Sequence, residues 1–566
     1  MAIKSTAAKV ATIQKGYALE GPAIELGAAI VDGELHKDAP VRLPLAMMNR
    51  HGLVAGATGT GKTVTLHMMA EQLSTAGVPV FLADLKGDLS GLATAAVGSE
   101  KLRARTESIG QPWSGKTFPV EFLALGGDGN GIPVRATITS FGPILLSRVM
   151  GLNDTQESSL QLVFYFADKS NLELIDLKDL RAVIQFLTSD EGKDELRELG
   201  GLSKATAGVI LRELITLEAQ GMEKFFGEPE FETAELLRTA PDGRGVVSCL
   251  ELPTLQTRPM LFSTFLMWLL ADLFEDLPEA GDLDKPKLVF FLDEAHLLFN
   301  GASKAFLDAI TTTVRLIRSK GVGIFFVTQT PKDVPADVLG QLANRVQHAL
   351  RAYTPEDAKA LKATVSTFPI SDYDLEETLT SAGIGEAVVT VLNENGAPTP
   401  VALTRLRAPE SVMGPSADAL ISSTVAGSAL LSKYGTAVDS VSAYEKITGE
   451  ARAGAGRAVP DGAGAVPDQG GALDPDAVDA EARRIEEEIL GRPSSRPAPA
   501  PQRQAPHQPQ RRAPRKAGGS AADDLAGALG GALGGGLKSM ARSLGTQLGR
   551  ELLRGVFGTS SKRRRR

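Results

Sequence analysis

The feature that most constrains the fold is a glycine-rich turn between two apolar stretches. Residues 56–63 read GATGTGKT, which fits the phosphate-binding pattern G-x-x-x-x-G-K-[ST] at every fixed position. The preceding run HGLVA is typical of a buried strand, and the following VTLHMMAEQLSTAG predicts an amphipathic helix. A strand, a phosphate loop and a helix in this order predict an α/β domain that binds a nucleotide.

The residues of this phosphate loop (56–63) have distinct expected roles. The glycines let backbone N–H groups turn inward around the phosphates, and the next helix directs its N-terminal dipole at them. We expect Lys62 to reach the β- and γ-phosphates and the Thr63 hydroxyl to bind Mg²⁺, with ATP as the nucleotide. The predicted nucleotide-binding residues are Gly56, Ala57, Thr58, Gly59, Thr60, Gly61, Lys62 and Thr63.

Strand-like and helical runs alternate along the chain. The strand-like runs are GLVAG, VPVFLAD, RGVVSCLEL, KLVFFLDE, GIFFVTQ, VQHALRAY and EAVVTVLN. Because most are apolar on both faces, they predict a mostly parallel central sheet covered by helices, joined by right-handed crossovers. The helix MLFSTFLMWLLADLFEDL, which precedes KLVFFLDE, is expected to be buried.

The chain divides by composition into a core, an insertion and a C-terminal tail. Helical signals without strands mark the insertion, and a stretch rich in Ala, Pro, Gly, Gln and Arg predicts a disordered linker. The last segment has leucines on one helix face among many glycines, and suits a partner surface, self-association or a membrane surface. The predicted segments are a lead-in (1–45), the first core part (46–140), the helical insertion (141–240), the second core part (241–410), an extension (411–453), the linker (454–520) and a Gly/Leu-rich basic helix (521–566).

Charge and cysteine content bear on the cellular compartment and on the partners of the chain. Residues 501–566 carry 14 Lys/Arg against 3 Asp/Glu, or +11, so the net charge of −8 leaves −19 on the rest. This imbalance argues against nonspecific nucleic-acid binding over the whole surface and leaves room for a local basic channel or a contact through the tail. The single cysteine, Cys249, is expected in the core, and a reducing cytoplasmic location without a membrane span is predicted.

Polar side chains at the ends of three strand-like runs suggest what happens to the nucleotide. Asp293 and Glu294 follow one apolar run, so Asp293 is expected to hold Mg²⁺ through water and Glu294 to polarise the attacking water. Gln329 ends the next run and is expected to contact the γ-phosphate, although such a residue also suits a simple turn. The stretch FLADLKGDLSG places Asp84, Lys86 and Asp88 near the nucleotide rim, and a role in the site is left open for all three.

Together these features resemble the HerA/FtsK group of P-loop ATPases, which are RecA-like hexameric motors. The likeness rests on RHGLVAGATGTGKT (50–63), LDEAH (292–296), RSKGVGIFFVTQTP (318–331) and LGQLANRVQHALR (339–351). It covers about 40–410. GLNDTQESSLQLVFYFADK, GDLDKPKLVFFLDEAHLLF and the GRELLRGVFG tail are more similar to the bacterial YjgR-type, HerA-helicase-like family.

The resemblance implies a RecA-like P-loop core and a homo-oligomeric ring, most simply a hexamer. It also implies that Arg318 reaches the nucleotide of a neighbouring subunit, with Arg315 as the reserve candidate and related roles open for Arg345 and Arg351. HerA proteins carry a sizeable N-terminal barrel, whereas about 45 residues precede the core here, which puts barrel-mediated partner binding in doubt.

Two functions follow from these expectations. The first is a ring ATPase that couples ATP hydrolysis to translocation or processing of double-stranded DNA. The alternative is an ATPase that assembles or remodels a protein complex without a DNA track, with the basic tail contacting an unknown protein. A small-molecule kinase fits the Asp-Glu pair poorly, and the chain lacks both the Asn-Lys-x-Asp segment of GTPases and the Leu-Ser-Gly-Gly-Gln signature of ABC transporters.

Overall fold

The computed structural model describes residues 5–449, apart from 128, 199, 253–258, 282, 300, 301 and 303. The predicted linker (454–520) and the Gly/Leu-rich helix (521–566) lie outside the described residues. Among the described helices, none is long and apolar enough to cross a membrane.

One sheet organises the described part of the chain. Its twelve strands follow the order β2-β1-β12-β11-β10-β3-β9-β8-β4-β7-β5-β6. All neighbours from β10 to β6 are parallel, and the pairs from β2 to β10 are antiparallel. The α/β class with a mostly parallel sheet is therefore confirmed. The strands are β1 (Ala23–Val31), β2 (Glu34–Pro44), β3 (Gly52–Ala55), β4 (Val80–Asp84), β5 (Val120–Leu125), β6 (Ile132–Val134), β7 (Val247–Glu251), β8 (Leu288–Leu292), β9 (Val322–Thr328), β10 (Asn344–His348), β11 (Glu386–Thr390) and β12 (Ala402–Leu406).

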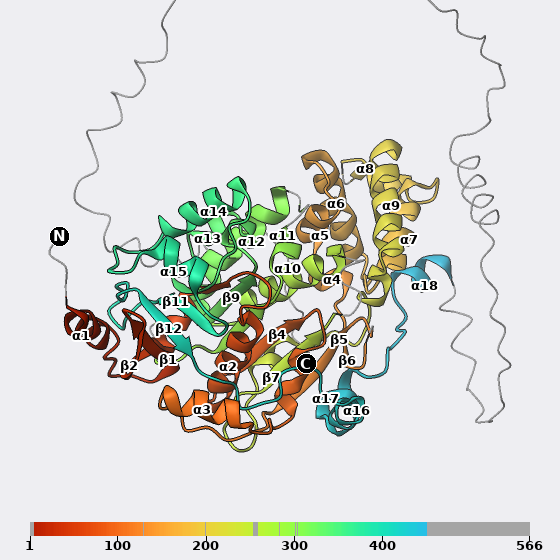
Figure 1. The fold of residues 1–566 in the computed structure, drawn as a ribbon. Helices are drawn as coiled ribbons and strands as arrows, with labels where there is room; N and C mark the ends of the chain where they lie inside the picture. Colours follow the sequence, from red (N-terminus) through yellow and green to blue (C-terminus); the bar gives the residue numbers. More distant parts are fainter. Residues whose placement is uncertain are drawn as a thin grey trace, which may run out of the picture. The chain divides into compact units, whose positions relative to one another are not determined.

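Helices cover both faces of the sheet (Figure 1). Successive side chains of a strand point to opposite faces. In β4, Phe81 and Ala83 therefore join the apolar cluster that includes α10 and α12, whereas Val80 and Leu82 join the cluster that includes α2. The α-helices are α1 (Thr6–Gly16), α2 (Lys62–Thr75), α3 (Glu100–Ser108), α4 (Ile138–Phe141), α5 (Pro143–Val149), α6 (Asp154–Lys169), α7 (Leu177–Thr188), α8 (Lys193–Glu198), α9 (Lys204–Ala219), α10 (Pro259–Asp276), α11 (His296–Phe299), α12 (Lys304–Ile317), α13 (Ala336–Leu339), α14 (Pro355–Val365), α15 (Leu375–Ser381), α16 (Asp418–Gly427), α17 (Ala429–Tyr434) and α18 (Ala443–Thr448).

Five strands of the sheet lie outside the seven strand-like runs given above, namely β1, β2, β5, β6 and β12. β5 lies outside the seven predicted runs, and β6 has three residues with a proline in the middle. β1 and β12 pair with each other in the antiparallel part of the sheet. β1, β2 and β12 belong to antiparallel pairs, β6 is short, and Glu121 interrupts the apolar run of β5, so these strands lack the long apolar run that marks a central parallel strand.

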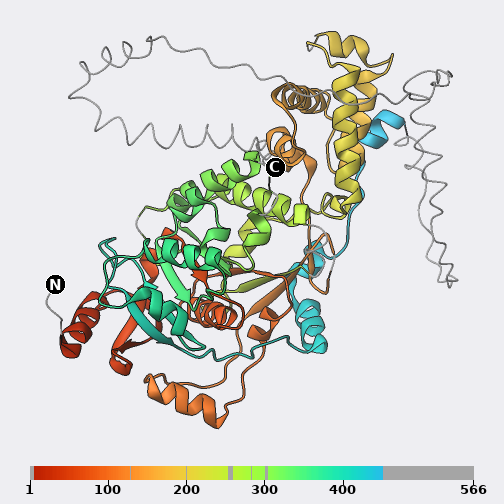
Figure 2. The same cartoon turned by 45° about the horizontal axis from the view of Figure 1, so that its top comes forward.

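The helices of the 141–240 segment pack into the same apolar cluster as one face of the sheet. Buried residues of α6, α7 and α9 belong to this cluster. After β12 the chain returns to these helices, because α18 packs on α7 (Figures 1 and 2, blue beside yellow). The contact centres on the buried Asp179, whose carboxylate accepts hydrogen bonds from the Tyr444 backbone at 2.9 Å and from the Ser442 hydroxyl. The 411–449 chain thus links the core and the helices of the 141–240 segment.

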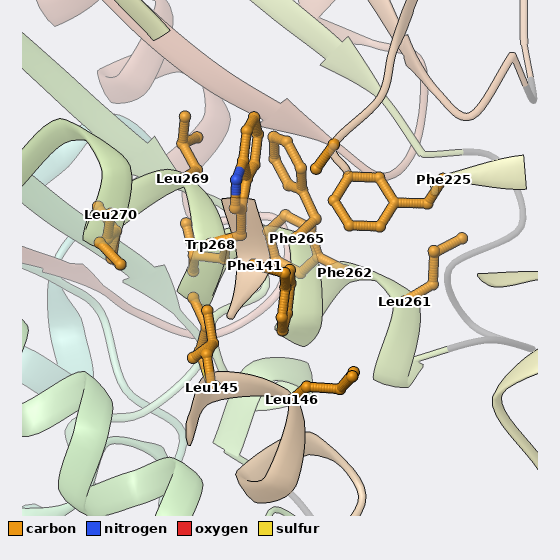
Figure 3. Packing of buried hydrophobic residues seen from close by; sticks show 14 of the residues in the cluster. Phe141, Leu145, Leu146, Phe225, Leu261, Phe262, Phe265, Trp268, Leu269 and Leu270 are labelled. Carbon is orange, nitrogen blue, oxygen red and sulfur yellow. The ribbon is translucent and has the colours of Figure 1, made fainter. Parts of the chain in front are cut away.

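Aromatic packing holds α10 in the core, as the sequence predicts. The Trp268 ring lies 5.9 Å from the Phe225 ring in a T-shaped arrangement and 6.1 Å from the Phe265 ring. Figure 3 shows Phe141 and Leu145 entering the same cluster. α10 therefore joins the sheet to the start of the helical segment.

We expect Trp268→Ala to lower the free energy of unfolding by about 3–5 kcal/mol, because Trp268 is fully buried and its removal leaves a large cavity. Urea unfolding followed by circular dichroism measures the change. Tyr165→Ala is the control, since Tyr165 is an exposed aromatic residue on α6 and its loss should change stability by less than about 0.5 kcal/mol. Equal losses for the two variants would contradict the assignment of α10 as a core helix.

Candidate nucleotide site

The phosphate loop connects β3 to α2 and is held by the strands on either side. The Gly56 N–H donates to the Thr328 carbonyl oxygen at 3.2 Å, and the Ala57 N–H donates to the Ala349 carbonyl oxygen at 2.8 Å. Gly56 is required by packing, because a Cβ there would lie 2.4 Å from the His348 Cβ. Gly61 has φ = 108° at the N-terminus of α2, where a side chain would be strained. The loop geometry is thus fixed by β9 and by the segment after β10.

The Lys62 side chain folds back onto the start of the phosphate loop. Its Nζ donates to the Gly56 carbonyl oxygen at 2.7 Å and to the Ala57 carbonyl oxygen at 3.3 Å. Burial lowers the pKa of Lys62, while the charges of Glu294 and Asp293 act in the opposite direction. The ammonium therefore sits where phosphate oxygens would enter the loop.

The predicted acidic pair follows β8 at the same edge of the sheet. Asp293 is buried, and burial raises the pKa of its carboxyl to about 6. Its Oδ1 accepts the Glu294 N–H at 2.8 Å. Glu294 has φ = 46°, a left-handed conformation that non-glycine residues seldom adopt and that tends to mark functional sites.

The Glu294 carboxylate pairs with Lys86 and lies near His296. Its Oε1 lies 2.5 Å from Lys86 Nζ, and its Oε2 lies 3.3 Å from His296 Nδ1. Oε2 and Nδ1 are buried and neither makes a hydrogen bond within the described residues, so the second contact is electrostatic at most. Burial raises the pKa of Glu294, but the hydrogen bond and charge of Lys86 outweigh it and the net pKa is lowered.

Asp84 and Lys86, whose roles the sequence leaves open, behave differently. Asp84 is buried at the end of β4 and caps the following turn, because its carboxylate accepts the N–H groups of Lys86, Gly87 and Leu89 at 2.7–3.1 Å. Burial raises the pKa of Asp84 to about 6. Asp84 thus fixes the turn, and Lys86 projects from it onto Glu294.

A family model described as "Helicase HerA-like C-terminal" matches residues 30–566. The chain belongs to this family. A curated relative, the "DNA double-strand break repair helicase HerA" of Saccharolobus solfataricus (strain ATCC 35092 / DSM 1617 / JCM 11322 / P2), is 23% identical over 360 residues. That match covers 62% of this chain and 64% of the relative, so the chain spans less than two thirds of the relative's length.

Two solved structures are also similar to this chain. The plasmid coupling protein TrwB, in complex with the non-hydrolysable ATP analogue ADPNP, has a TM-score of 0.48 and 16% identity, and the match covers 74% of this chain and 95% of TrwB. VirB4 of Thermoanaerobacter pseudethanolicus has a TM-score of 0.42 and 15% identity, covering 69% of this chain and 97% of VirB4.

Gln329 of this HerA-like chain stands between the phosphate loop and the acidic pair. It follows β9, which lies between β3 and β8 in the sheet. Gln329 is exposed, whereas the preceding Thr328 is buried and donates to Asp333 Oδ2 at 2.9 Å. The order β3-β9-β8 therefore brings Lys62, Gln329 and Glu294 to one edge of the sheet.

Arg318 lies at the amino ends of the parallel strands, opposite the end of the sheet that carries the phosphate loop. It begins the 3-10 turn Arg318–Lys320 before β9, and it is exposed, as is Arg315. The seven residues of β9 separate it from Gln329 by about 20 Å, at roughly 3.3 Å per residue. Arg318 therefore cannot contact the phosphate loop of its own subunit.

The other arginines are placed by contacts within the chain. Arg345 Nη1 donates to the Thr367 hydroxyl at 2.5 Å, whereas Arg351 is exposed. Arg105 lies in α3, and its Nη2 donates to the Gly385 carbonyl oxygen at 2.8 Å and to the Leu406 carbonyl oxygen at 3.0 Å. The Gly385 N–H in turn donates to the Thr60 carbonyl oxygen. Arg105 therefore supports the phosphate loop through Gly385, and its guanidinium is bonded to backbone carbonyl oxygens.

His348 is a site residue that the sequence analysis missed. Its ring Nδ1 lies 3.1 Å from the Thr60 carbonyl oxygen and its Nε2 lies 2.9 Å from the Thr65 hydroxyl. Burial and the Lys62 charge lower the pKa of His348 to about 4, so the neutral ring donates through Nδ1 and accepts through Nε2. The position lies in the VQHALR run, but only the fold brings it against the loop.

The residues present fit a nucleotide with Mg²⁺. Thr63 lies in the first turn of α2, which follows β3, and Asp293 directly follows β8, two strands away from β3, at the same edge. Among the described residues, no group of three or more His, Cys, Asp or Glu side chains could hold a metal by itself. This agrees with Mg²⁺ chemistry, in which one or two protein oxygens, phosphates and waters complete the coordination.

Proposed function

We propose that this HerA-like chain is a motor ATPase that works as a hexameric ring and couples ATP hydrolysis to DNA translocation or processing. The observation that carries the proposal is the convergence of the phosphate loop, Gln329 and Glu294 at the carboxyl edge of three adjacent strands. Ligands bind at this edge in open α/β sheets. Membership of a helicase family and the name of the curated HerA relative support DNA as the track.

In this proposal each side chain has one task during hydrolysis. The loop N–H groups and Lys62 bind the phosphates, and the Thr63 hydroxyl and Asp293 hold Mg²⁺, which neutralises charge on the β- and γ-phosphates. Glu294 accepts a proton from the attacking water as the water oxygen bonds to the γ-phosphorus. The bond between the γ-phosphorus and the bridging oxygen breaks, and ADP leaves with that oxygen. Gln329 contacts the γ-phosphate and reports its loss to β9.

The alternative, an ATPase that remodels a protein complex, is favoured by one observation. The chain before residue 501 carries a net charge of −19, which repels the phosphates of a DNA duplex. The basic tail would then contact a protein partner.

ATP turnover with and without duplex DNA, measured across a salt series, separates the two functions. A DNA motor should show stimulation by DNA that falls steeply as salt rises, because phosphate contacts release counterions. An ATP turnover rate that DNA does not change at any salt concentration would favour protein remodelling. Absence of turnover under all conditions would remove both.

A further inference from the structure

The ion pair between Lys86 and Glu294 joins a half-exposed ammonium group to a largely buried carboxylate. The Lys86 side chain is 50% exposed and that of Glu294 is 12% exposed. Asp84 holds the backbone of the turn that carries Lys86, so the side chain beyond it supplies the freedom to move. When this pair breaks, the Lys86 ammonium is therefore the partner that moves.

The pair conflicts with the role of Glu294 as the base for water. A base must offer an oxygen within hydrogen-bond reach of the water. Glu294 Oε1 is taken by Lys86 Nζ, and Oε2 is buried beside His296. Oε1 can accept a second hydrogen bond, but the Lys86 ammonium on it makes Glu294 a weaker base, so loss of this contact would strengthen Glu294 as a proton acceptor.

A bound triphosphate offers Lys86 a stronger partner. Lys86 and Glu294 both lie within electrostatic range of Lys62, the residue that should hold the β- and γ-phosphates. A γ-phosphate carries more negative charge than one carboxylate and so attracts an ammonium more strongly at equal distance. The ionisable groups that face Glu294 are Lys62, Lys86, Asp88, Asp293 and His296.

We propose that Lys86 senses the γ-phosphate by changing partner. It holds Glu294 Oε1 in the geometry seen here and transfers to the γ-phosphate when a triphosphate binds, which frees Glu294 to polarise water. This inference rests on the proposed ATPase function. Lys86 thus contacts the γ-phosphate directly, and Glu294 becomes a stronger base only when there is a phosphate to remove.

Nucleotide binding tests the exchange without requiring turnover. The full-length protein is titrated with Mg²⁺ and either ADPNP or ADP in a calorimeter. Lys86→Met should weaken ADPNP binding about tenfold and leave ADP binding unchanged, because only the former has a γ-phosphate. Lys86→Arg should retain most of the ADPNP affinity. Lys116→Met is the matched control, because Lys116 is 51% exposed and pairs at 2.9 Å with Glu410, whose side chain is 15% exposed.

Turnover provides the second measurement. At saturating ATP, kcat of Lys86→Met should fall because the γ-phosphate has lost a cation. A rise in kcat would mean that Lys86 only restrains Glu294, and it would overturn the exchange. An unchanged ratio of ADPNP to ADP affinity would overturn it too, as would equal losses for both nucleotides, which indicate a disturbed turn. If the parent binds nucleotide without hydrolysing it, the proposed function fails, whereas the affinity ratio still tests the contact of Lys86 with the γ-phosphate.

Discussion

Glu294→Gln should bind ATP and lose nearly all hydrolysis, with a fall in kcat of roughly 10²- to 10⁴-fold, the range for removal of a general base. The amide keeps the size and position of the side chain but cannot accept the proton of the attacking water. Because Lys62 and the loop are untouched, binding of ADPNP should persist. Phosphate release under saturating ATP and calorimetry with ADPNP measure the two effects.

Two further variants serve as comparisons for this result, one expected to lose binding and one expected to keep hydrolysis. Lys62→Ala should lose tight binding and turnover together, since it removes the cation at the loop mouth. Glu251→Gln is the matched control, because Glu251 is a half-buried glutamate at the end of β7, two strands from β8 at the same edge. It should hydrolyse ATP like the parent. Hydrolysis by Glu294→Gln near the parent rate would show that another group activates the water.

Local patterns were enough to predict the parts of the site that lie on one strand–loop–helix unit. Gly56, Lys62 and Thr63 follow from a fixed spacing, and Glu294 follows from an apolar run that ends in acids. A spacing pattern reports only on residues close in sequence. The loop and the acidic pair could therefore be placed without the fold.

The contacts of Lys86 and His348 could not be predicted in this way. Lys86 meets Glu294 because β4 and β8 are neighbours, with Ala83 opposite Leu292. His348 meets Thr60 because β10 lies beside β3. The sheet order that sets both contacts depends on crossovers of the chain, and no spacing along the sequence encodes it.

The chemistry of phosphoryl transfer leaves room for a cation from another subunit. The transferred group spreads negative charge over its oxygens, and an arginine supplied to it contributes roughly 10³- to 10⁵-fold in rate. The guanidinium of Arg105 is bonded to the Gly385 and Leu406 carbonyl oxygens, and the exposed Arg351 lies two residues after Ala349, whose carbonyl oxygen accepts the Ala57 N–H of the loop. If the ring is the active form, a neighbouring subunit can add an arginine to the cations Lys62 and Lys86.

Arg318 is the candidate for that cation. It is exposed at the sheet edge opposite the phosphate loop, so it is out of reach of its own nucleotide. A planar guanidinium suits two-point contact with phosphate oxygens better than an ammonium does. The resemblance to RecA-like rings implies that this helix end faces the next subunit.

Arg318→Ala should bind ATP and assemble, yet hydrolyse it at least 10³-fold more slowly than the parent, at the lower end of the range for such fingers. Arg315→Ala, which removes the exposed reserve candidate three positions earlier, separates the two assignments and should keep most activity if Arg318 is the arginine that acts. Mixing Arg318→Ala with Lys62→Ala, itself inactive, should restore part of the activity if subunits exchange. In such mixed rings an Arg318→Ala subunit has an intact loop, and a Lys62→Ala neighbour supplies the arginine. Rings shown by mass spectrometry to be mixed but without recovered turnover, or a fully active monomer, would rule out action between subunits.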